Sequence, residues 1–329
     1  MNIAIIDDYQ DVVRTLDCFR KLDGHDVTVW NHHTKDVALL ARRLQYTEAL
    51  VLIRERTPIP GELIRQLPRL KLISQNGVYP HVDVEACTRH GVVLSSGMGT
   101  RPSYATAELA WGLMIAALRH IPQEMAALRA GHWQGTMGTG LRGKTLGIYG
   151  YGRIGQVIAG YAKPFGMKVL IWGREGSLAR AREHGHATAS SREAFFGTVD
   201  VLTLQLRATE ETRGIVTAAD LACMKPTALL VNTSRASLIE PGALLAALRA
   251  GRPGMAALDV FDEEPVLGAR DPLVQLPNVV CTPHLGYVES TTYEFALGAA
   301  FDQVLAFAAG KPINVINPAA LATQPARPS

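Results

Sequence analysis

Short apolar runs alternate with helical patterns along almost the whole chain, and this alternation limits the possible folds more than any other feature. In the first hundred residues we expect strands at 2–6, 27–30, 49–53, 70–74 and 92–94, with helices at 37–43 and 61–67 between them. Runs that are apolar throughout suit strands covered on both faces, as in parallel sheets. The first part of the chain is therefore predicted to form a parallel α/β domain.

The same alternation resumes after residue 144 with six more strand patterns. They lie at 145–149, 168–171, 199–204, 228–232, 254–257 and 279–282, and helices are expected at 154–165, 242–250 and 291–309. Six strands joined by five crossovers match a complete Rossmann-type, doubly wound parallel sheet. A chain of 329 residues is long enough for both domains.

Between the two regions lies a helical stretch at 104–120 that is apolar almost all round. Such a helix is either central to its own chain or covered by a second subunit. Trp111, Met114 and Leu118 would leave a large exposed patch on a monomer, so we expect a homodimer contact through this stretch.

Composition excludes several classes of function. The net charge is +3 and basic residues cluster at most in pairs, so no nucleic-acid partner is expected. The opening apolar run stops at Asp7, which does not suit a signal peptide, and no apolar run is long enough to span a membrane. The four cysteines are scattered without a metal-binding spacing, so we expect reduced, buried thiols, no metal and a cytoplasmic location.

The segment that follows the first strand of the second region carries the spacing G-x-G-x-x-G. Gly150 permits a tight turn, Gly152 lets the backbone approach a pyrophosphate, and Gly155 lets the helix pack close to the strand. The helix N-terminus then faces the phosphates. Between a strand and a helix this pattern predicts a dinucleotide site, and Arg153 and Ile154 belong to the same cofactor-binding turn.

Residues about twenty positions further on bear on the choice between NAD(H) and NADP(H). An acidic residue usually binds the ribose hydroxyls there, but here Gly173 takes that position, followed by Arg174 and Glu175. Arg174 could meet a 2′-phosphate or stack on the adenine, and Glu175 could still bind the ribose. The pattern favours NADP(H) by a small margin and leaves NAD(H) open.

Three polar residues each follow a late strand pattern, at the edge where such sheets bind ligands: Arg235, Glu264 and His284. Each alone has a plain alternative, namely a solvated arginine, a helix-capping glutamate and a core histidine. Together they match the reduction of a 2-keto acid. Arg235 would bind the carboxylate and polarise the carbonyl, His284 would exchange the proton, and Glu264 would fix the imidazole tautomer.

These motifs resemble the signatures of the D-isomer-specific 2-hydroxyacid dehydrogenases, which include glyoxylate/hydroxypyruvate reductases and D-3-phosphoglycerate dehydrogenases. The resemblance covers nearly the whole chain and rests on the glycine turn and on the segments NTSRASLIE, DVFDEEP and TPHLG, in that order. It implies hydride transfer between a nicotinamide cofactor, NAD(P)(H), and C2 of a small D-2-hydroxy or 2-keto acid, most simply a glyoxylate- or hydroxypyruvate-like one. It also implies that Arg235, Glu264 and His284 form the catalytic triad.

The resemblance further implies a discontinuous domain layout. A flavodoxin-like α/β substrate domain would comprise 1–98 plus 289–329, with the cofactor domain, 99–288, inserted. Hinge closure over the substrate and a homodimer would follow. Additional cofactor contacts are implied at Thr106, Thr233, Asp259 and Gly286, with Thr106 near the phosphates and Asp259 on the nicotinamide carboxamide.

Substrate binding is expected at Arg54, Gly77 and Val78, together with Arg235 and His284. Arg54 follows a strand and would bind an anionic substrate. The alternative is a surface arginine that pairs with Glu55 or Glu62.

The chain departs from the family pattern at three positions near the substrate. Tyr79 stands where the family has a second glycine, His81 stands close to the usual asparagine, and Tyr287 replaces a small residue after His-x-Gly. These changes indicate either an unusual substrate pocket or harmless loop variation.

Two other functions stay open. A nucleotide-sensing interaction protein of the corepressor type would keep the fold without the chemistry, and a phosphite-type anion dehydrogenase would use the same triad. Formate oxidation is disfavoured, because formate dehydrogenases resemble this family but pair a glutamine with the histidine, and this chain has Glu264.

Overall fold

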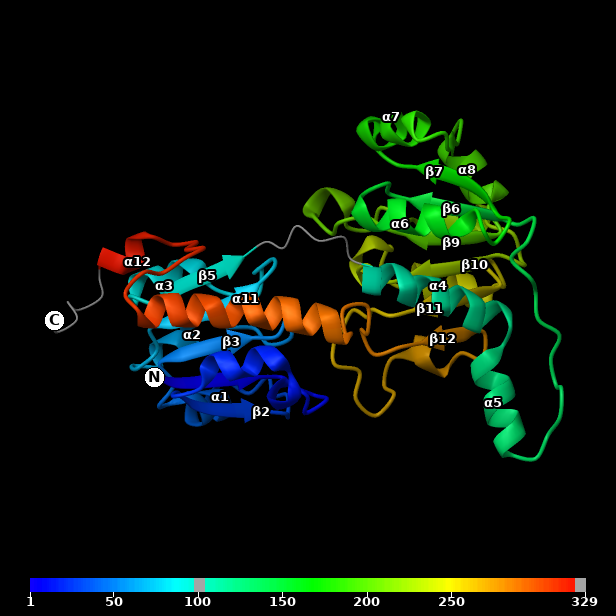
Figure 1. Cartoon of the computed structure of the whole chain (residues 1–329). Helices are drawn as coiled ribbons and strands as arrows, with labels where there is room; N and C mark the ends of the chain where they lie inside the picture. Colours follow the sequence, from blue (N-terminus) through cyan, green and yellow to red (C-terminus); the bar gives the residue numbers. More distant parts are fainter. Residues whose placement is uncertain (98–103, 323–329) are drawn as a thin grey trace. The chain divides into compact units, whose positions relative to one another are not determined.

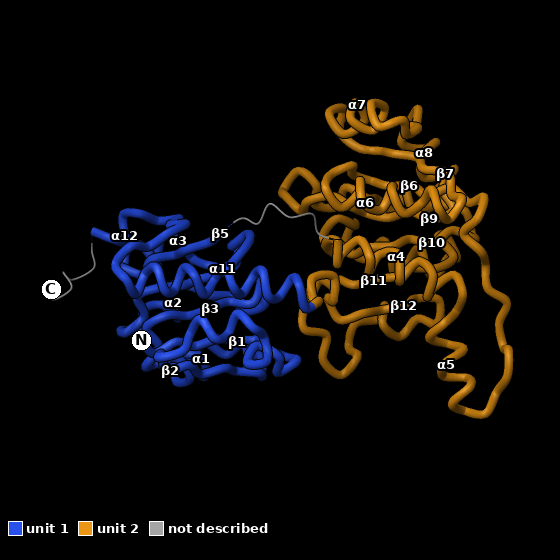
Figure 2. The backbone as a smooth tube through the Cα atoms, in the orientation of Figure 1, with its two compact units in different colours: residues 1–101, 290–329 blue, residues 102–289 orange. Residues whose placement is uncertain are grey.

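The chain folds into two compact units in a computed structural model that describes residues 1–97 and 104–322 (Figure 1). Unit 1 comprises residues 1–101 with 290–329, and unit 2 comprises residues 102–289 (Figure 2). Each unit contains one parallel sheet with helices packed against it. The domain boundary expected between residues 98 and 99 lies outside the described residues.

The sheet of unit 1 has five parallel strands in the order β2-β1-β3-β4-β5. Their bounds are β1 (Asn2–Ile6), β2 (Asp26–Trp30), β3 (Ala49–Leu52), β4 (Leu72–Asn76) and β5 (Val93–Gly97). This is the strand order of flavodoxin-like folds, which confirms the fold expected for this part of the chain. The central strand β3 is buried along its whole length, as its apolar sequence requires.

Helix α11 belongs to unit 1 although it comes from the end of the chain. It runs across the sheet in Figure 1. The hydroxyl of Ser74 on β4 donates to the carbonyl of Ala300 (2.8 Å), and the amide of Gln303 donates to Ser74 (3.0 Å). These buried hydrogen bonds fix the helix on the sheet. The helices of this unit are η1 (Val13–Thr15), η2 (Asp17–Leu22), α1 (Val37–Leu44), α2 (Gly61–Arg65), α3 (Val84–Arg89), α11 (Ser290–Ala308) and α12 (Ala319–Ala322).

The sheet of unit 2 has seven strands in the order β12-β11-β10-β9-β6-β7-β8. Their bounds are β6 (Thr145–Tyr149), β7 (Lys168–Trp172), β8 (Ala187–Thr188), β9 (Val201–Leu204), β10 (Leu229–Asn232), β11 (Met255–Leu258) and β12 (Val279–Cys281). Counted from β6, this is the doubly wound order 3-2-1-4-5-6 with one strand more, which confirms the Rossmann-type sheet. The strand missing from the prediction is β8, because two residues make no recognisable apolar run.

The helices of unit 2 lie between these strands and before β6. They are α4 (Tyr104–Leu118), α5 (Ile121–Arg129), α6 (Arg153–Ala162), α7 (Glu175–Glu183), α8 (Arg192–Thr198), η3 (Glu210–Thr212), α9 (Ala218–Cys223), η4 (Ala236–Leu238), α10 (Ala243–Arg249) and η5 (Pro272–Gln275). The reversal of strand order falls between β6 and β9, so the carboxyl ends of these two strands border the crevice where such sheets bind ligands.

Helix α4 buries the three side chains that were expected to form an exposed patch, so this premise of the predicted dimer contact is wrong, while the dimer itself stays a prediction. Trp111, Met114 and Leu118 are 7%, 0% and 5% exposed, because the helix packs against α6, β10 and β11. Exposed apolar side chains occur instead on α5 and in the segment that follows it, where Trp133 is 78% and Met137 is 94% exposed. A helix that is apolar on all sides is expected to be buried, but the pattern does not show whether its own chain or a second subunit covers it.

The cysteines only partly match the expectation of buried thiols. Cys18 and Cys87 are buried, and burial raises the pKa of both thiols to about 12. Cys223 is exposed and Cys281 is half-buried, so the prediction was wrong for these two. Within residues 1–97 and 104–322, no helix is long and apolar enough to cross a membrane, and no three His, Cys, Asp or Glu side chains gather as a metal site.

Candidate active site

The glycine turn lies between β6 and α6, at the crevice of unit 2. Gly150 has φ +99°, and a Cβ at this position would lie 2.6 Å from the carbonyl oxygen of Gln205. A Cβ on Gly155 would collide with the carbonyl oxygen of Gly150. A Cβ on Gly152 would have no atom within 4 Å. Two glycines thus allow close packing of the turn, and the third leaves open space beside its backbone.

The N-terminus of α6 opens onto this space. Gly152 is its N-cap residue, and no side chain caps the helix there, so the positive end of the helix dipole, at the turn that begins with Arg153 and Ile154, suits an anion. Gly152 and Arg153 are exposed, and Ile154 is half-buried. Open backbone space and uncapped amides at the end of a ten-residue helix fit a pyrophosphate.

The end of β7 lies directly beside the glycine turn. The amide of Gly150 donates to the carbonyl of Trp172 (2.8 Å), and a Cβ on Gly173 would lie 3.8 Å from Gly150. Arg174 is exposed and forms an ion pair of 2.5 Å with Glu211, which sequence reasoning did not single out. Glu175 pairs with Arg182 at 2.8 Å.

Arg235 follows β10 in a loop shaped by Asn232. The amide of Asn232 donates to the carbonyl of Arg235 (2.9 Å), and its oxygen accepts from the backbone of Ser234 (3.0 Å). The guanidinium donates to the carbonyl of Ser234 (2.7 Å) and is half-buried. Thr233 is buried, and the amide of Gln205 donates to its hydroxyl (3.4 Å).

The pair of His284 and Glu264 joins the loops that follow β12 and β11. Nδ1 of His284 lies 2.5 Å from Oε2 of Glu264, and the other carboxylate oxygen accepts from the backbone amide of Phe261 (3.0 Å). Burial raises the pKa of Glu264, but the hydrogen bond and the charge of His284 more than offset it and hold that pKa below its usual value. The charge of Arg235 acts in the same direction, so Arg235 lies close enough to influence the Glu264 carboxylate.

Asp259 holds the loop that carries His284. It is completely buried and accepts hydrogen bonds from the hydroxyl of Thr282 (2.6 Å) and from the amides of Leu285 (2.7 Å) and Gly286 (2.8 Å). Burial outweighs these hydrogen bonds and raises the pKa of Asp259 above its usual value.

Thr106 holds the same loop from α4. Its hydroxyl donates to the carbonyl of Gly286 at 2.7 Å. The sequence predicted Asp259 and Thr106 as cofactor contacts and did not predict that they hold this loop. The available signal for the second role was an acidic residue, Asp259, directly after an apolar strand. Asp259 and Thr106 hold this loop from two sides. Within the loop, His284 has a left-handed backbone conformation with φ +54°.

The expected substrate residues Arg54 and Gly77 lie side by side in unit 1. A Cβ on Gly77, which has φ +121°, would stand 3.2 Å from the guanidinium of Arg54. Arg54 is itself left-handed, with φ +61°, and pairs with Glu55 at 3.6 Å. The carbonyls of Gly77 and Val78 accept hydrogen bonds from Ser96 (2.7 Å) and Gln75 (2.9 Å), respectively.

The three departures from the family pattern have different environments. Tyr79 packs against the core of unit 1, which indicates a structural role for that ring. The ring nitrogens of His81 are buried, and burial lowers the pKa of that imidazole. Tyr287 stands edge-on to His284 with 5.5 Å between ring centres, so it borders that histidine directly.

A buried polar cluster at the end of β1 was also missed. Asp7, 3% exposed and with φ +67°, accepts from the hydroxyl of Thr57 (2.7 Å) and lies 3.0 Å from Nδ1 of His33. Arg56 donates to the backbone carbonyl of Asp7 and to the hydroxyl of Tyr293 (3.2 Å). These contacts hold the segment that carries Arg54.

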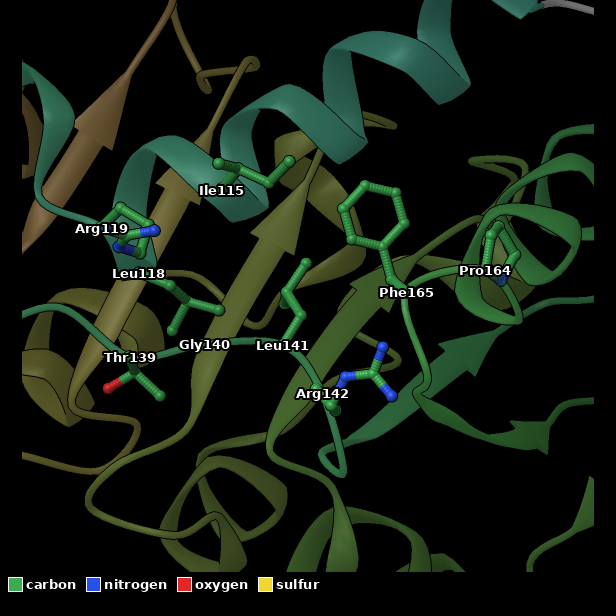
Figure 3. A pocket seen from close by; sticks show the side chains of 9 residues that line it. All are labelled: Ile115, Leu118, Arg119, Thr139, Gly140, Leu141, Arg142, Pro164 and Phe165. Atoms are coloured by element: carbon green, nitrogen blue, oxygen red, sulfur yellow. The ribbon is translucent and has the colours of Figure 1, made fainter.

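The cavity shown in Figure 3 is separate from the residues above. It has a volume of about 360 Å³ and is lined by the end of α4, by residues 139–142 and by Pro164 and Phe165. Residues 139–142 precede β6, whereas the glycine turn follows it. None of the expected site residues lines this cavity, so it is not the candidate active site.

Comparison with known proteins assigns residues 111–286 to a family model described as the NAD binding domain of D-isomer specific 2-hydroxyacid dehydrogenases. The chain is 37% identical over 307 residues to a glyoxylate reductase of Aeropyrum pernix, covering 89% of this chain and 90% of the relative. It is 40% identical over 260 residues to 4-methyl-2-oxopentanoate reductase A of Aspergillus oryzae, covering 76% and 77%. A solved phosphoglycerate oxidoreductase of Vibrio cholerae O395 superposes with a TM-score of 0.91 at 51% identity, over 94% of this chain and 99% of the other.

Proposed function

The chain belongs to the D-isomer specific 2-hydroxyacid dehydrogenase family, and on that premise we propose that its substrate is a small D-2-hydroxy or 2-keto acid of the glyoxylate or hydroxypyruvate type. Its relatives make it a nicotinamide-dependent oxidoreductase. The observation that carries the proposal is the hydrogen-bonded pair of His284 and Glu264 within range of the charge on Arg235. The relatives are named for different substrates, so the identity of the acid has to be determined by experiment.

Arg235 binds the carboxylate of the substrate in this proposal. Its planar, permanently charged guanidinium matches a carboxylate in two parallel hydrogen bonds. The same group stabilises the negative charge that develops on the carbonyl oxygen during reduction. The loop fixed by Asn232 sets the position from which it does so.

His284 exchanges the proton with the oxygen on C2. Because Glu264 engages Nδ1, Nε2 is the nitrogen that faces the substrate. Glu264 fixes the tautomer and stabilises the protonated imidazole, which gives up its proton during reduction and regains it from solvent afterwards. In oxidation the neutral imidazole accepts the proton of the hydroxyl.

The cofactor is held at the glycine turn in this proposal, by Gly150 to Gly155 with Thr233 and Arg174 nearby. When bound, it supplies the hydride to C2 or accepts it from C2. The open space beside Gly152 and the uncapped end of α6 support its pyrophosphate there. We propose a small preference for NADP(H), supported by Arg174, which directly follows Gly173 at the position where the usual acid is missing.

Arg54 binds a further anionic group of the substrate in this proposal. Its contact with Gly77 and its left-handed backbone support a specialised position. Its ion pair with Glu55 agrees equally with a surface role, so substrate kinetics decide between the two.

The functional molecule is a homodimer in this proposal, assembled through α5 and the segment that follows it. No residue of α5 is buried, and Met125 and Leu128 are 49% and 59% exposed in addition to Trp133 and Met137. Figure 1 shows α5 projecting from unit 2, with the chain after it turning back toward the unit. Such an exposed apolar segment is typical of a surface covered by a partner.

We also keep a cytoplasmic location as a prediction, which the free cysteines support.

A panel of 2-keto acids tests the function. Glyoxylate, hydroxypyruvate and phenylpyruvate are each incubated with NADH and with NADPH while absorbance at 340 nm is followed. Oxidation of the cofactor that depends on one of these acids is the expected result. Cofactor binding without turnover on any acid would favour the nucleotide-sensing interaction protein, and oxidation of phosphite with NAD would favour the anion dehydrogenase.

A further inference from the structure

The end of β7 lacks the group that usually selects the cofactor. Gly173 takes the position of the ribose-binding acid, and the glycine turn packs directly against it. The nearest acid in the sequence, Glu175, pairs with Arg182 on the same helix at 2.8 Å. A carboxylate that binds the ribose hydroxyls of a nucleotide at this edge would therefore have to come from another segment of the chain.

Glu211 brings a carboxylate to this place from a different loop. Its Oε2 lies 2.5 Å from the guanidinium of Arg174, the residue that caps α7 at the end of β7. The two side chains are 75% and 73% exposed, so a ligand can reach both. The pair presents one acceptor and one fixed cation at the edge where the adenosine ribose binds.

The loop after β9 holds Glu211 in position. The carbonyl of Gln205 and the side chain of Leu206 pack against the site of a Cβ on Gly150, so the loop starts at the glycine turn. Beyond it, the buried hydroxyl of Thr212 donates to the carbonyl of Arg207 (2.7 Å) and accepts from the amide of Thr209 (2.8 Å). Glu211 stands next to this anchored threonine, which lowers the entropic cost of its ion pair.

We propose that Glu211 determines the choice between NAD(H) and NADP(H) by accepting the ribose hydroxyls and by competing with a 2′-phosphate for Arg174. This inference rests on the proposed function, because it requires a dinucleotide at the glycine turn. Arginine alone would favour the phosphate, which carries up to two negative charges. The carboxylate of Glu211 neutralises that arginine and repels the phosphate, so it opposes the preference for NADP(H) that Arg174 alone would give.

The neighbouring residue Glu210 supplies a matched control. It lies in the same turn, η3, and carries the same charge, but it pairs with Arg213 at 3.4 Å rather than with Arg174. Its exposed fraction, 89%, is no smaller than that of Glu211. A substitution there changes the net charge equally without freeing Arg174.

The experiment measures binding of adenosine 2′,5′-bisphosphate and of 5′-AMP by calorimetry to the full chain and to its Glu211→Gln and Glu210→Gln variants. In Glu211→Gln we expect the bisphosphate to bind about fivefold more tightly, the effect of one charge at roughly 4 Å in water. Binding of 5′-AMP should weaken by about threefold, since its ribose hydroxyls keep an amide acceptor but lose the charged one. Glu210→Gln should leave both affinities near those of the unaltered chain.

Equal gains in the two variants, or equal changes for the two nucleotides in Glu211→Gln, would overturn the proposal. Binding of neither nucleotide to any of the three proteins would overturn it together with the proposed function. Binding with the expected pattern but without turnover on any keto acid would leave Glu211 as the selecting residue and remove the proposed reaction alone.

Discussion

Nδ1 of His284 lies 2.5 Å from Oε2 of Glu264, although the two residues stand in loops after different strands. The carboxylate receives a second hydrogen bond from the backbone of Phe261, so its orientation is fixed independently of the imidazole. An imidazole supported at one nitrogen exchanges protons through the other.

Replacement of His284 by alanine should reduce turnover by about a hundredfold or more, the usual contribution of general acid–base catalysis. Cofactor binding, measured by quenching of nicotinamide fluorescence, should stay within about twofold, because the glycine turn is formed by other loops. His90→Ala, on an exposed residue of unit 1 outside the proposed site and dimer contact, serves as the control. Near-normal turnover in His284→Ala would remove the histidine from the mechanism.

Replacement of Glu264 by glutamine should move the activity of reduction to lower pH. The pKa of Glu264 lies below its usual value, so the carboxylate is ionised at neutral pH and stabilises the protonated imidazole that reduction needs. Glutamine keeps the shape but not the charge, and the pH above which the rate declines should fall. Comparison of pH–rate profiles checks this, with Glu263→Gln on the exposed neighbour as control.

The same variant gives a prediction for stability. A carboxyl group whose pKa is lowered by folding contributes stability above its unfolded pKa, about 4.5, and loses it as the pH falls through the folded value. The difference in free energy of unfolding between the protein and Glu264→Gln should therefore be largest near neutral pH and shrink below about pH 4.5. A constant difference down to pH 3 would contradict the direction of the pKa shift.

Most strands could be predicted because burial on both faces leaves a direct trace in the sequence. The runs expected at 2–6 and 145–149 coincide with β1 and β6. The two-residue strand β8 could not be found, since its pairing with β7 is a property of the sheet. Helix α4 was predicted, but a second subunit was expected to cover it, whereas its apolar side chains pack inside unit 2. An apolar helix surface does not show which element packs on it.

The site divides in the same way. Arg235, Glu264 and His284 were recognisable, because each lies in a polar segment after an apolar run and the three segments together match a family pattern. The ion pair of Arg174 with Glu211 could not be predicted, because 37 positions separate the two residues. Each lies in a polar segment that is typical of any exposed loop. The hold of Asp259 on the His284 loop likewise depends on the adjacency of β11 and β12.

Replacement of Arg54 by alanine should raise the KM for a dicarboxylic 2-keto acid by about tenfold, as expected for loss of a charge-assisted hydrogen bond. The KM for glyoxylate, which has no second anionic group, should change little. Arg65→Ala, on an exposed residue of α2, controls for the loss of one positive charge from unit 1. Unchanged kinetics for the dianionic acid would assign Arg54 to its surface pair with Glu55.

Replacement of Trp133 by glutamate should weaken the proposed homodimer by at least about tenfold, since buried tryptophans contribute strongly to interfaces. Light scattering after gel filtration over a range of concentrations checks the mass. Leu267→Glu provides a matched control, because this apolar side chain is 68% exposed but lies outside α5 and the following segment. An unaltered chain that is monomeric at all concentrations would contradict the dimer itself.

Replacement of Asp259 by asparagine should destabilise unit 2 and lower turnover together. Both oxygens of Asp259 accept hydrogen bonds, and an asparagine offers one oxygen and one donor, so at least one buried amide or hydroxyl loses its acceptor. The expected cost is about 1–3 kcal/mol of unfolding free energy. Because the freed groups lie on either side of His284, turnover should fall even at temperatures where the protein stays folded. Asp262→Asn, at an exposed position, should do neither. Loss of stability with full turnover would mean that the catalytic loop is held in place without this carboxylate.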